Sequence, residues 1–99
     1  LRTMAGAYEV AQLKGVALHP AQLMWLATQG SAKALNLDNQ IGNIAPGMAA
    51  DFVVLDLSST PAISQRSTRA NDVWEELFPT IMMGDDRAIA ATYIAGKKI

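Results

Sequence analysis

The chain has 99 residues, which suffice for one domain. Hydrophobic residues make up 51% and charged residues 17%, so a disordered chain is excluded and other polypeptide is expected to cover part of the surface. The net charge is -1 and the sequence has no basic stripe that would favour nucleic acid. The absence of cysteine excludes a disulfide framework and thiol chemistry. No apolar run approaches the roughly 18 residues of a membrane span.

The first segment, Leu1 to Leu13, is predicted to be an amphipathic helix. Its apolar residues recur with the spacing of one helix face: Leu1, Met4, Ala5, Tyr8 and Ala11. Gly15 suits the position just after the last turn, where glycine accepts a left-handed backbone. No N-cap residue precedes Leu1, and the chain does not begin with Met. These two features predict a polypeptide that extends upstream.

A second helix is predicted to begin at His19-Pro20. Proline suits the first helical position, because the backbone N–H that it lacks would have no partner within the helix there. Its segment Leu23 to Ala27 is apolar nearly all round, which predicts deep burial. His19 is the only histidine and stands where an N-cap belongs. No His/Cys cluster surrounds it in the sequence, so a capping role is favoured over catalysis or metal binding.

The stretch from Ile41 to Asp56 is predicted to be a turn-rich loop that leads into a strand. Gly42 and the pair Pro46-Gly47 supply turn chemistry. The β-branched and aromatic run Phe52–Leu55 then indicates a buried strand. Gly42 to Gly47 is not a phosphate loop, because it lacks the Lys-Ser/Thr ending and leads into a strand.

The next segment, Ser58 to Asn71, has no clear period and is predicted to be a polar loop. Asp72 followed by Glu75 indicates a capping box and a third helix. Pro79 predicts a kink or a break in that helix, and Gly84 predicts its end.

The C-terminal segment is predicted to be β-structure. Asp85-Asp86-Arg87 indicates a charged turn, Ile89–Ile94 a strand, Ala95-Gly96-Lys97 a tight turn and Lys98-Ile99 the start of a return strand. The fold is therefore predicted to be α+β, with about three helices packed on a small, mostly antiparallel sheet. The sequence leaves open whether Phe52–Leu55 pairs with Ile89–Ile94 within one chain or across two.

Other residues that could carry chemistry favour structural roles. Asp51 and Asp56 bracket a strand, and residues five apart on a strand point to opposite faces, so a carboxylate pair is disfavoured. Asp85-Asp86 fits a solvated turn better than a cation site. Trp25 and Trp74 are predicted to pack in the core rather than to stack on nucleotides. Taken alone, the residues indicate an α/β piece without a self-contained active site.

Several stretches nevertheless resemble one group of enzymes. Leu26–Leu37 (LATQGSAKALNL), Ile41–Gly47 (IGNIAPG) and Ala50–Asp56 (ADFVVLD) are typical of the metal-dependent amidohydrolase superfamily. There the chain leaves a (β/α)8 barrel and returns to a small β-sandwich. Trp74–Phe78 (WEELF) and Gly84–Gly96 (GDDRAIAATYIAG) are more similar to guanine deaminases than to the cytosine, adenosine-type and triazine hydrolases.

This resemblance implies a hydrolase of purine catabolism that converts guanine and water to xanthine and ammonia with a zinc-activated water, in the cytoplasm. The family's metal ligands are a His-x-His pair, two further His and an Asp, and none of these motifs occurs here. No catalytic, cofactor-binding or metal residue is therefore carried over, and the chain alone is expected to be inactive. Whether it counts as an enzyme by itself stays open.

The resemblance also implies a domain layout and a set of partners. The chain is expected to form a single domain, 1–99, in which 1–37 is a helical segment that closes the barrel and 41–99 is the β-sandwich part with an inserted helix. Its partner is the remainder of the barrel, or a second copy in a homodimer, because strands without partners expose edges. Guanine is expected to bind only the full-length parent. The alternative is a small stand-alone dimerisation or interaction module derived from such an enzyme.

Overall fold

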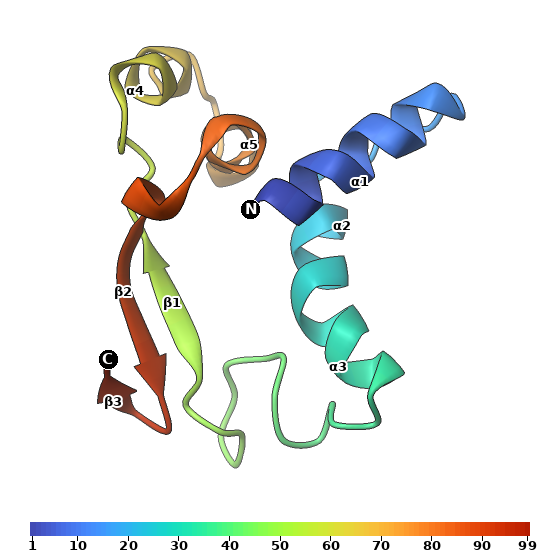
Figure 1. Ribbon diagram of the computed structural model, residues 1–99, viewed down its shortest axis with the longest axis vertical. Coiled ribbons are helices and arrows are strands. Elements are labelled where there is room, and N and C mark those ends of the chain that lie inside the picture. The colour runs from blue at the N-terminus through green and yellow to red at the C-terminus, as the bar shows by residue number, and fades with distance from the viewer.

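The computed structural model describes residues 1–99 and shows an α+β chain with one antiparallel sheet (Figure 1). The class predicted from the sequence is therefore confirmed. The elements are α1 (Arg2–Leu13), α2 (Pro20–Trp25), the π-helix η1 (Leu26–Gly30), α3 (Ser31–Ala34), β1 (Phe52–Leu55), α4 (Pro61–Ser67), α5 (Val73–Met83), the 3-10 turn η2 (Asp86–Ala88), β2 (Ile89–Ile94) and β3 (Lys97–Lys98).

Helix α1 confirms the first prediction and ends as its sequence indicates. Gly15 has φ +77°, the left-handed backbone that glycine adopts without strain. Its N–H donates to the carbonyl of Gln12 at 3.0 Å, and the N–H of Val16 donates to the carbonyl of Ala11 at 2.9 Å. This pair of bonds is the Schellman motif, which satisfies the last carbonyl groups of the helix.

The segments α2, η1 and α3 follow one another without a break and form one helical column. The sequence did not predict the π-turn, which is held by side chains: the Ser31 hydroxyl donates to the carbonyl of Leu26 at 2.6 Å, and the Thr28 hydroxyl donates to that of Met24 at 2.7 Å. The predicted deep burial is wrong. Leu23 is buried, but Trp25 and Leu26 are 46% and 45% exposed, because nothing in this chain packs over that side of the column.

Helix α4 occupies part of the segment that was predicted to be a loop, so that prediction is wrong. Thr60 caps the helix by accepting from the N–H of Ile63 at 3.3 Å, and Pro61 fills the first position. This Thr-Pro pair is a start signal for a helix. A single apolar residue, Ile63, is fully buried, so the segment shows no apolar period.

Helix α5 begins at the predicted place and runs through Pro79. The Asp72 carboxylate accepts from the N–H of Glu75 at 2.8 Å, whereas the Glu75 carboxylate accepts from Asn71 at 2.8 Å rather than from Asp72. Pro79 does not break the helix, which continues to Met83. The reason is tertiary packing, since Leu77 and Ile81 are buried on either side of the proline.

The sheet has the order β1-β2-β3, and both pairs of strands are antiparallel. Phe52 pairs with Tyr93 and Leu55 with Ile89, with a β-bulge between Val54 and Leu55. Phe52–Leu55 therefore pairs with Ile89–Ile94 within one chain, which answers the question that the sequence left open. The predicted burial of β1 is wrong, because Val53 is 50% exposed and neither face of the strand is fully covered.

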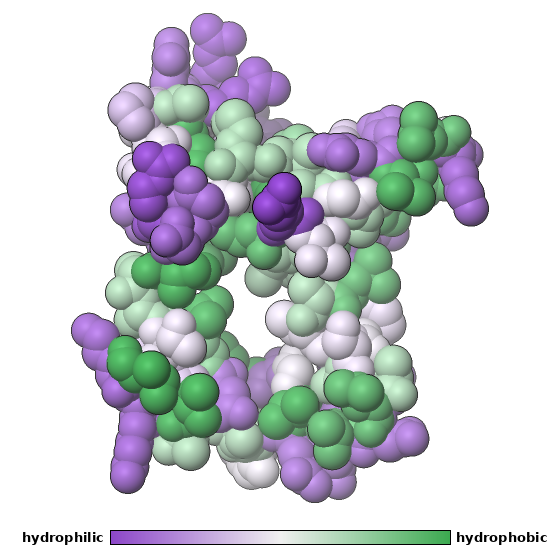
Figure 2. All heavy atoms as spheres, in the orientation of Figure 1, coloured by the Kyte–Doolittle hydropathy of each residue, from purple (hydrophilic) through white to green (hydrophobic).

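The core lies where α2 and α5 cross, around Leu23, Leu77 and Ile81. Leu55, at the end of β1, and Leu57 pack against this cluster. The helices thus pack mainly on one another, and the sheet joins them at one end instead of lying beneath them as predicted. Figure 2 shows the consequence as an opening through the molecule, between the column α2–η1–α3 and the sheet. None of the helices combines the length and the apolar character that a membrane span requires.

Candidate functional site

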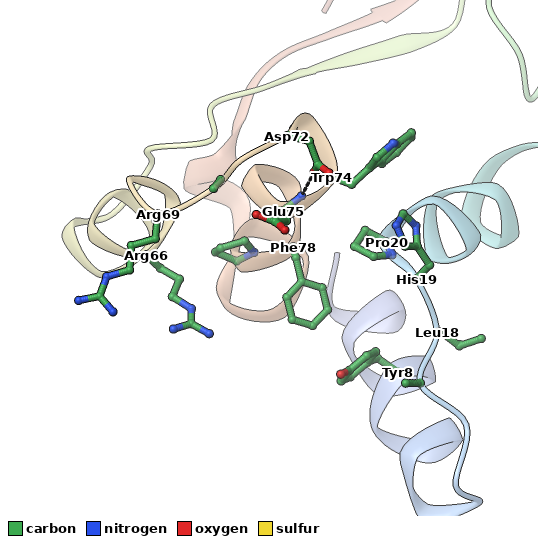
Figure 3. A pocket seen from close by; sticks show the side chains of 13 residues that line it. Tyr8, Leu18, His19, Pro20, Arg66, Arg69, Asp72, Trp74, Glu75 and Phe78 are labelled. Carbon is green, nitrogen blue, oxygen red and sulfur yellow. Dashed lines mark hydrogen bonds between the residues drawn. The ribbon is translucent and has the colours of Figure 1, made fainter.

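An open pocket of about 620 Å³ lies between α1, the N-terminal ends of α2 and α5, and α4 (Figure 3). The residues that line it come from segments far apart in the sequence: Tyr8, Ala17, Leu18, His19, Pro20, Arg66, Arg69, Ala70, Asp72, Trp74, Glu75, Phe78 and Pro79. The pocket combines aromatic walls with both signs of charge, which is typical of a ligand-binding site.

Two aromatic contacts frame the pocket. The rings of Tyr8 and Phe78 meet edge to face, with centroids 5.1 Å apart, and those of His19 and Trp74 do so at 6.0 Å. Both geometries are favourable for aromatic pairs. Trp74 is 39% exposed, and Trp25 lies outside the pocket with about half of its surface exposed. The prediction that both tryptophans pack in the core is therefore wrong.

His19 takes the predicted capping role. Its Nδ1 accepts from the N–H of Ala21 at 3.1 Å, and its own backbone N–H donates to the Gln22 side chain at 2.7 Å. Because Nδ1 is the acceptor, the proton of the neutral ring lies on Nε2. The ring thus completes a capping box at the start of α2 and links the N-terminal ends of α2 and α5.

The carboxylates of the pocket are also engaged in capping. Asp72 and Glu75 accept from backbone N–H groups at the start of α5, which satisfies donors that lack a partner inside the helix. Arg66 and Arg69 are exposed and form no ion pair. Neither arginine was predicted as a pocket residue, because their segment was predicted to be a loop. The Thr60-Pro61 start signal could have identified α4.

The pocket offers surfaces for binding but no assembled catalytic group. Its lining contains no serine, threonine, cysteine or lysine. Its histidine and both carboxylates accept backbone N–H groups as caps, and the Tyr8 hydroxyl accepts from the Gln12 side chain. Nucleophilic catalysis needs a nucleophile within reach of a free base. Nor does any group of three or more His, Cys, Asp or Glu side chains converge in a way that could hold a metal ion.

The other carboxylates named in the sequence analysis lie apart and have structural partners. Asp51 accepts from the N–H of Ala95 at 2.8 Å and ties the β2–β3 turn to the start of β1, whereas Asp56 accepts from the N–H of Ser58 at 2.9 Å. The two do not form a pair.

Asp85 caps η2 and forms the only ion pair of the chain, with Arg87 at 2.8 Å. The hydrogen bonds from Arg87 lower the pKa of the Asp85 carboxyl, and the same contact raises the pKa of Arg87. This is the predicted charged turn.

Comparison with known proteins gives one family over the whole chain. Residues 1–99 match the model of the amidohydrolase family. Among curated proteins, a guanine deaminase of Escherichia coli (strain K12) is 41% identical over 99 residues, which is 100% of this chain and 23% of that protein. The chain thus spans about a quarter of the length of this relative.

Solved structures agree with the sequence comparison. The structure of E. coli guanine deaminase superposes with a TM-score of 0.94 at 41% identity, over 99% of this chain and 23% of the other. The crystal structure of guanine deaminase from Bradyrhizobium japonicum gives a TM-score of 0.76 at 33% identity, over 84% of this chain and 20% of the other.

Proposed function

Since the chain belongs to the amidohydrolase family, we propose that it is the C-terminal portion of a zinc-dependent guanine deaminase, which converts guanine and water to xanthine and ammonia. The observation that supports this most strongly is the superposition on E. coli guanine deaminase, because 99% of the chain follows that structure with a TM-score of 0.94. We also propose that this step of purine degradation takes place in the cytoplasm.

The side chains of this chain do not fit a metal site. Members of the family typically depend on a metal, yet no cluster here offers three converging ligands, and the one histidine has its Nδ1 engaged in a cap. We therefore assign no catalytic step to the residues of this chain. We expect the metal, the proton-transferring groups and the guanine site in the remainder of the parent polypeptide.

In this proposal the chain has a structural role in the parent enzyme. Residues 1–37 close the (β/α)8 barrel, and residues 41–99 form the β-sandwich part, with α4 and α5 as its helical insertion. The free edge of β1 supports the second half of this assignment, because its unpaired N–H and C=O groups can accept a strand from elsewhere in the parent.

The proposal is tested by following xanthine formation from guanine. The full-length polypeptide that carries this chain, loaded with zinc, is expected to release xanthine and ammonia, whereas the isolated chain is expected to release neither. Turnover by the isolated chain would refute the structural role, and a full-length polypeptide that binds zinc but leaves guanine unchanged would refute the proposed substrate.

A second candidate is a small stand-alone dimerisation or interaction module. The exposed apolar residues favour it, since sixteen large hydrophobic side chains, from Val10 to Ile99, are substantially accessible. Sedimentation of the isolated chain discriminates between the two candidates. A stable homodimer at low concentration supports the module, and a monomer counts against it.

A further inference from the structure

The pocket of Figure 3 contains charged groups that the chain itself does not use. Its carboxylates are engaged, because Asp72 accepts from the N–H of Glu75 and Glu75 accepts from that of Asn71, each at 2.8 Å. Its two guanidinium groups differ, since neither Arg66 nor Arg69 forms an ion pair. The donors of both arginines are therefore available to a ligand that offers acceptor oxygens.

The positions of these charges favour an anion. Both carboxylates lie at the start of α5, where the helix dipole and the bonded N–H groups stabilise negative charge. The arginines have no such compensation. Arg66 lies in the last turn of α4, and the N–H of Arg69 donates to its carbonyl at 3.3 Å, so the two side chains leave neighbouring positions of the backbone. One anion can therefore contact both guanidinium groups.

The charge of the arginine pair selects the kind of anion. A phosphate monoester carries a charge of about -1.5 to -2 at neutral pH, which matches two guanidinium groups. A guanidinium group also binds phosphate oxygens in a bidentate manner. A carboxylate would leave one of the two positive charges unmatched. The arginine pair thus fits a phosphate monoester best.

The aromatic side chains beside the arginines suit a flat ring. Tyr8 and Phe78 meet edge to face, with centroids 5.1 Å apart and 71° between the planes, which leaves most of their ring faces free of this contact. In Figure 3 the guanidinium groups extend from α4 on one side of Phe78, and Tyr8 lies on the other side. Free aromatic faces are stacking surfaces for heteroaromatic rings. The volume of about 620 Å³ lies in the usual range for a small-molecule site.

We propose that this pocket binds a small phosphate monoester that carries a flat heteroaromatic ring, such as a nucleoside monophosphate. Its phosphate contacts Arg66 and Arg69, and its ring stacks on Phe78. The inference depends on residues of this chain and not on the reaction of the parent polypeptide.

The test is isothermal titration of the full-length polypeptide with adenosine 5′-monophosphate. This probe has both parts of the ligand and lacks the guanine ring of the proposed substrate. Saturable binding is expected. Adenosine, without the phosphate, and inorganic phosphate, without the ring, are each expected to bind at least about tenfold more weakly. Absence of binding, or equal binding of adenosine or of inorganic phosphate, would overturn the proposal.

A double variant tests the phosphate contact. Arg66→Gln with Arg69→Gln is expected to weaken binding of adenosine 5′-monophosphate about tenfold, because charge-assisted hydrogen bonds to the phosphate are lost. Both side chains are exposed, so the exchange leaves the core unchanged. Arg2→Gln is the matched control, since Arg2 is an exposed arginine that does not line this pocket. The same loss in the control, or no loss in the double variant, would refute the arginine contact.

A second pair of variants tests the ring contact. Phe78→Leu keeps an apolar side chain without an aromatic face, and binding is expected to weaken about fivefold. Phe52→Leu is the same exchange in β1, where Phe52 stacks on Tyr93 outside the pocket, and binding is expected to stay unchanged. Unchanged binding in Phe78→Leu would refute the stacking contact. If Phe78→Leu does not fold, the arginine variants and the comparison with adenosine still decide.

These titrations fail or succeed independently of the proposed function. Arginine-dependent binding of the nucleotide in a polypeptide that forms no xanthine refutes the deaminase proposal and supports the pocket. Xanthine formation without nucleotide binding refutes the pocket and supports the deaminase.

Discussion

Helix α5 and the column α2–η1–α3 are similar in apolar character but different in surroundings. In α5, Leu77, Thr80 and Ile81 are buried, because α1, α2 and α4 all pack around it. In the column, Trp25 and Leu26 stay about half exposed. The difference shows that apolar residues in a sequence predict a covered surface but do not specify which polypeptide covers it.

The largest expected effect separates these two regions by truncation. Ile81→Ala removes a side chain that is 1% exposed at the centre of the core and is expected to lower the free energy of unfolding of the isolated chain by about 2–5 kcal/mol. Leu26→Ala removes a side chain of the same size that is 45% exposed, and its cost is expected to stay below about 1 kcal/mol. Urea unfolding followed by circular dichroism measures both. Similar losses would contradict the comparison.

An intermediate effect is expected at the helix starts that join the two regions. His19→Ala removes the acceptor for the Ala21 N–H at the start of α2 and is expected to cost about 1 kcal/mol, as is Asp72→Ala at the start of α5. His19→Asn keeps a capping side chain and is expected to recover most of the loss. An Asn variant as unstable as the Ala variant would assign the effect to the lost contact with Trp74 instead of to the cap.

Local signals in the sequence were sufficient for much of the secondary structure. Helix α1 with its end at Gly15, the cap at His19, the start of α5 at Asp72, and both strands β1 and β2 were predicted with bounds close to those observed. Each of these features depends on a few neighbouring residues, such as a capping oxygen or an alternating run of side chains. The aromatic pocket could not be predicted, because it joins segments about 60 residues apart, from Tyr8 to Arg69.

The errors have a common cause in packing. Helix α4 was missed because a short helix with one buried residue, Ile63, shows no apolar period. Pro79 was expected to disturb α5, but buried neighbours hold the helix together. Burial of Trp25 and of β1 was overestimated because no other element of this chain packs over these apolar side chains. Intrinsic propensities are weak where tertiary contacts, or their absence, decide.

The smallest expected effect lies at the exposed end of the buried helix, where Asp85 and Arg87 connect α5 to β2. Folding lowers the pKa of Asp85, mainly through the hydrogen bonds from Arg87, so the stability that this carboxylate contributes is present above its ordinary pKa and is lost as the pH falls through the lowered value. Asp85→Asn is expected to reduce the loss of melting temperature on acidification slightly, because both side chains are exposed and solvent screens the pair.

Asp86→Asn is the control for that change, since Asp86 accepts no side-chain hydrogen bond from Arg87. Thermal unfolding of both variants from neutral to acidic pH checks the expectation. An equal change in the two variants would mean that general charge, and not the Asp85–Arg87 contact, sets the acid response. A loss of stability on acidification as large as that caused by Ile81→Ala would mean that the Asp85–Arg87 turn is buried. Helix α5 and the turn that follows it would then no longer differ in exposure.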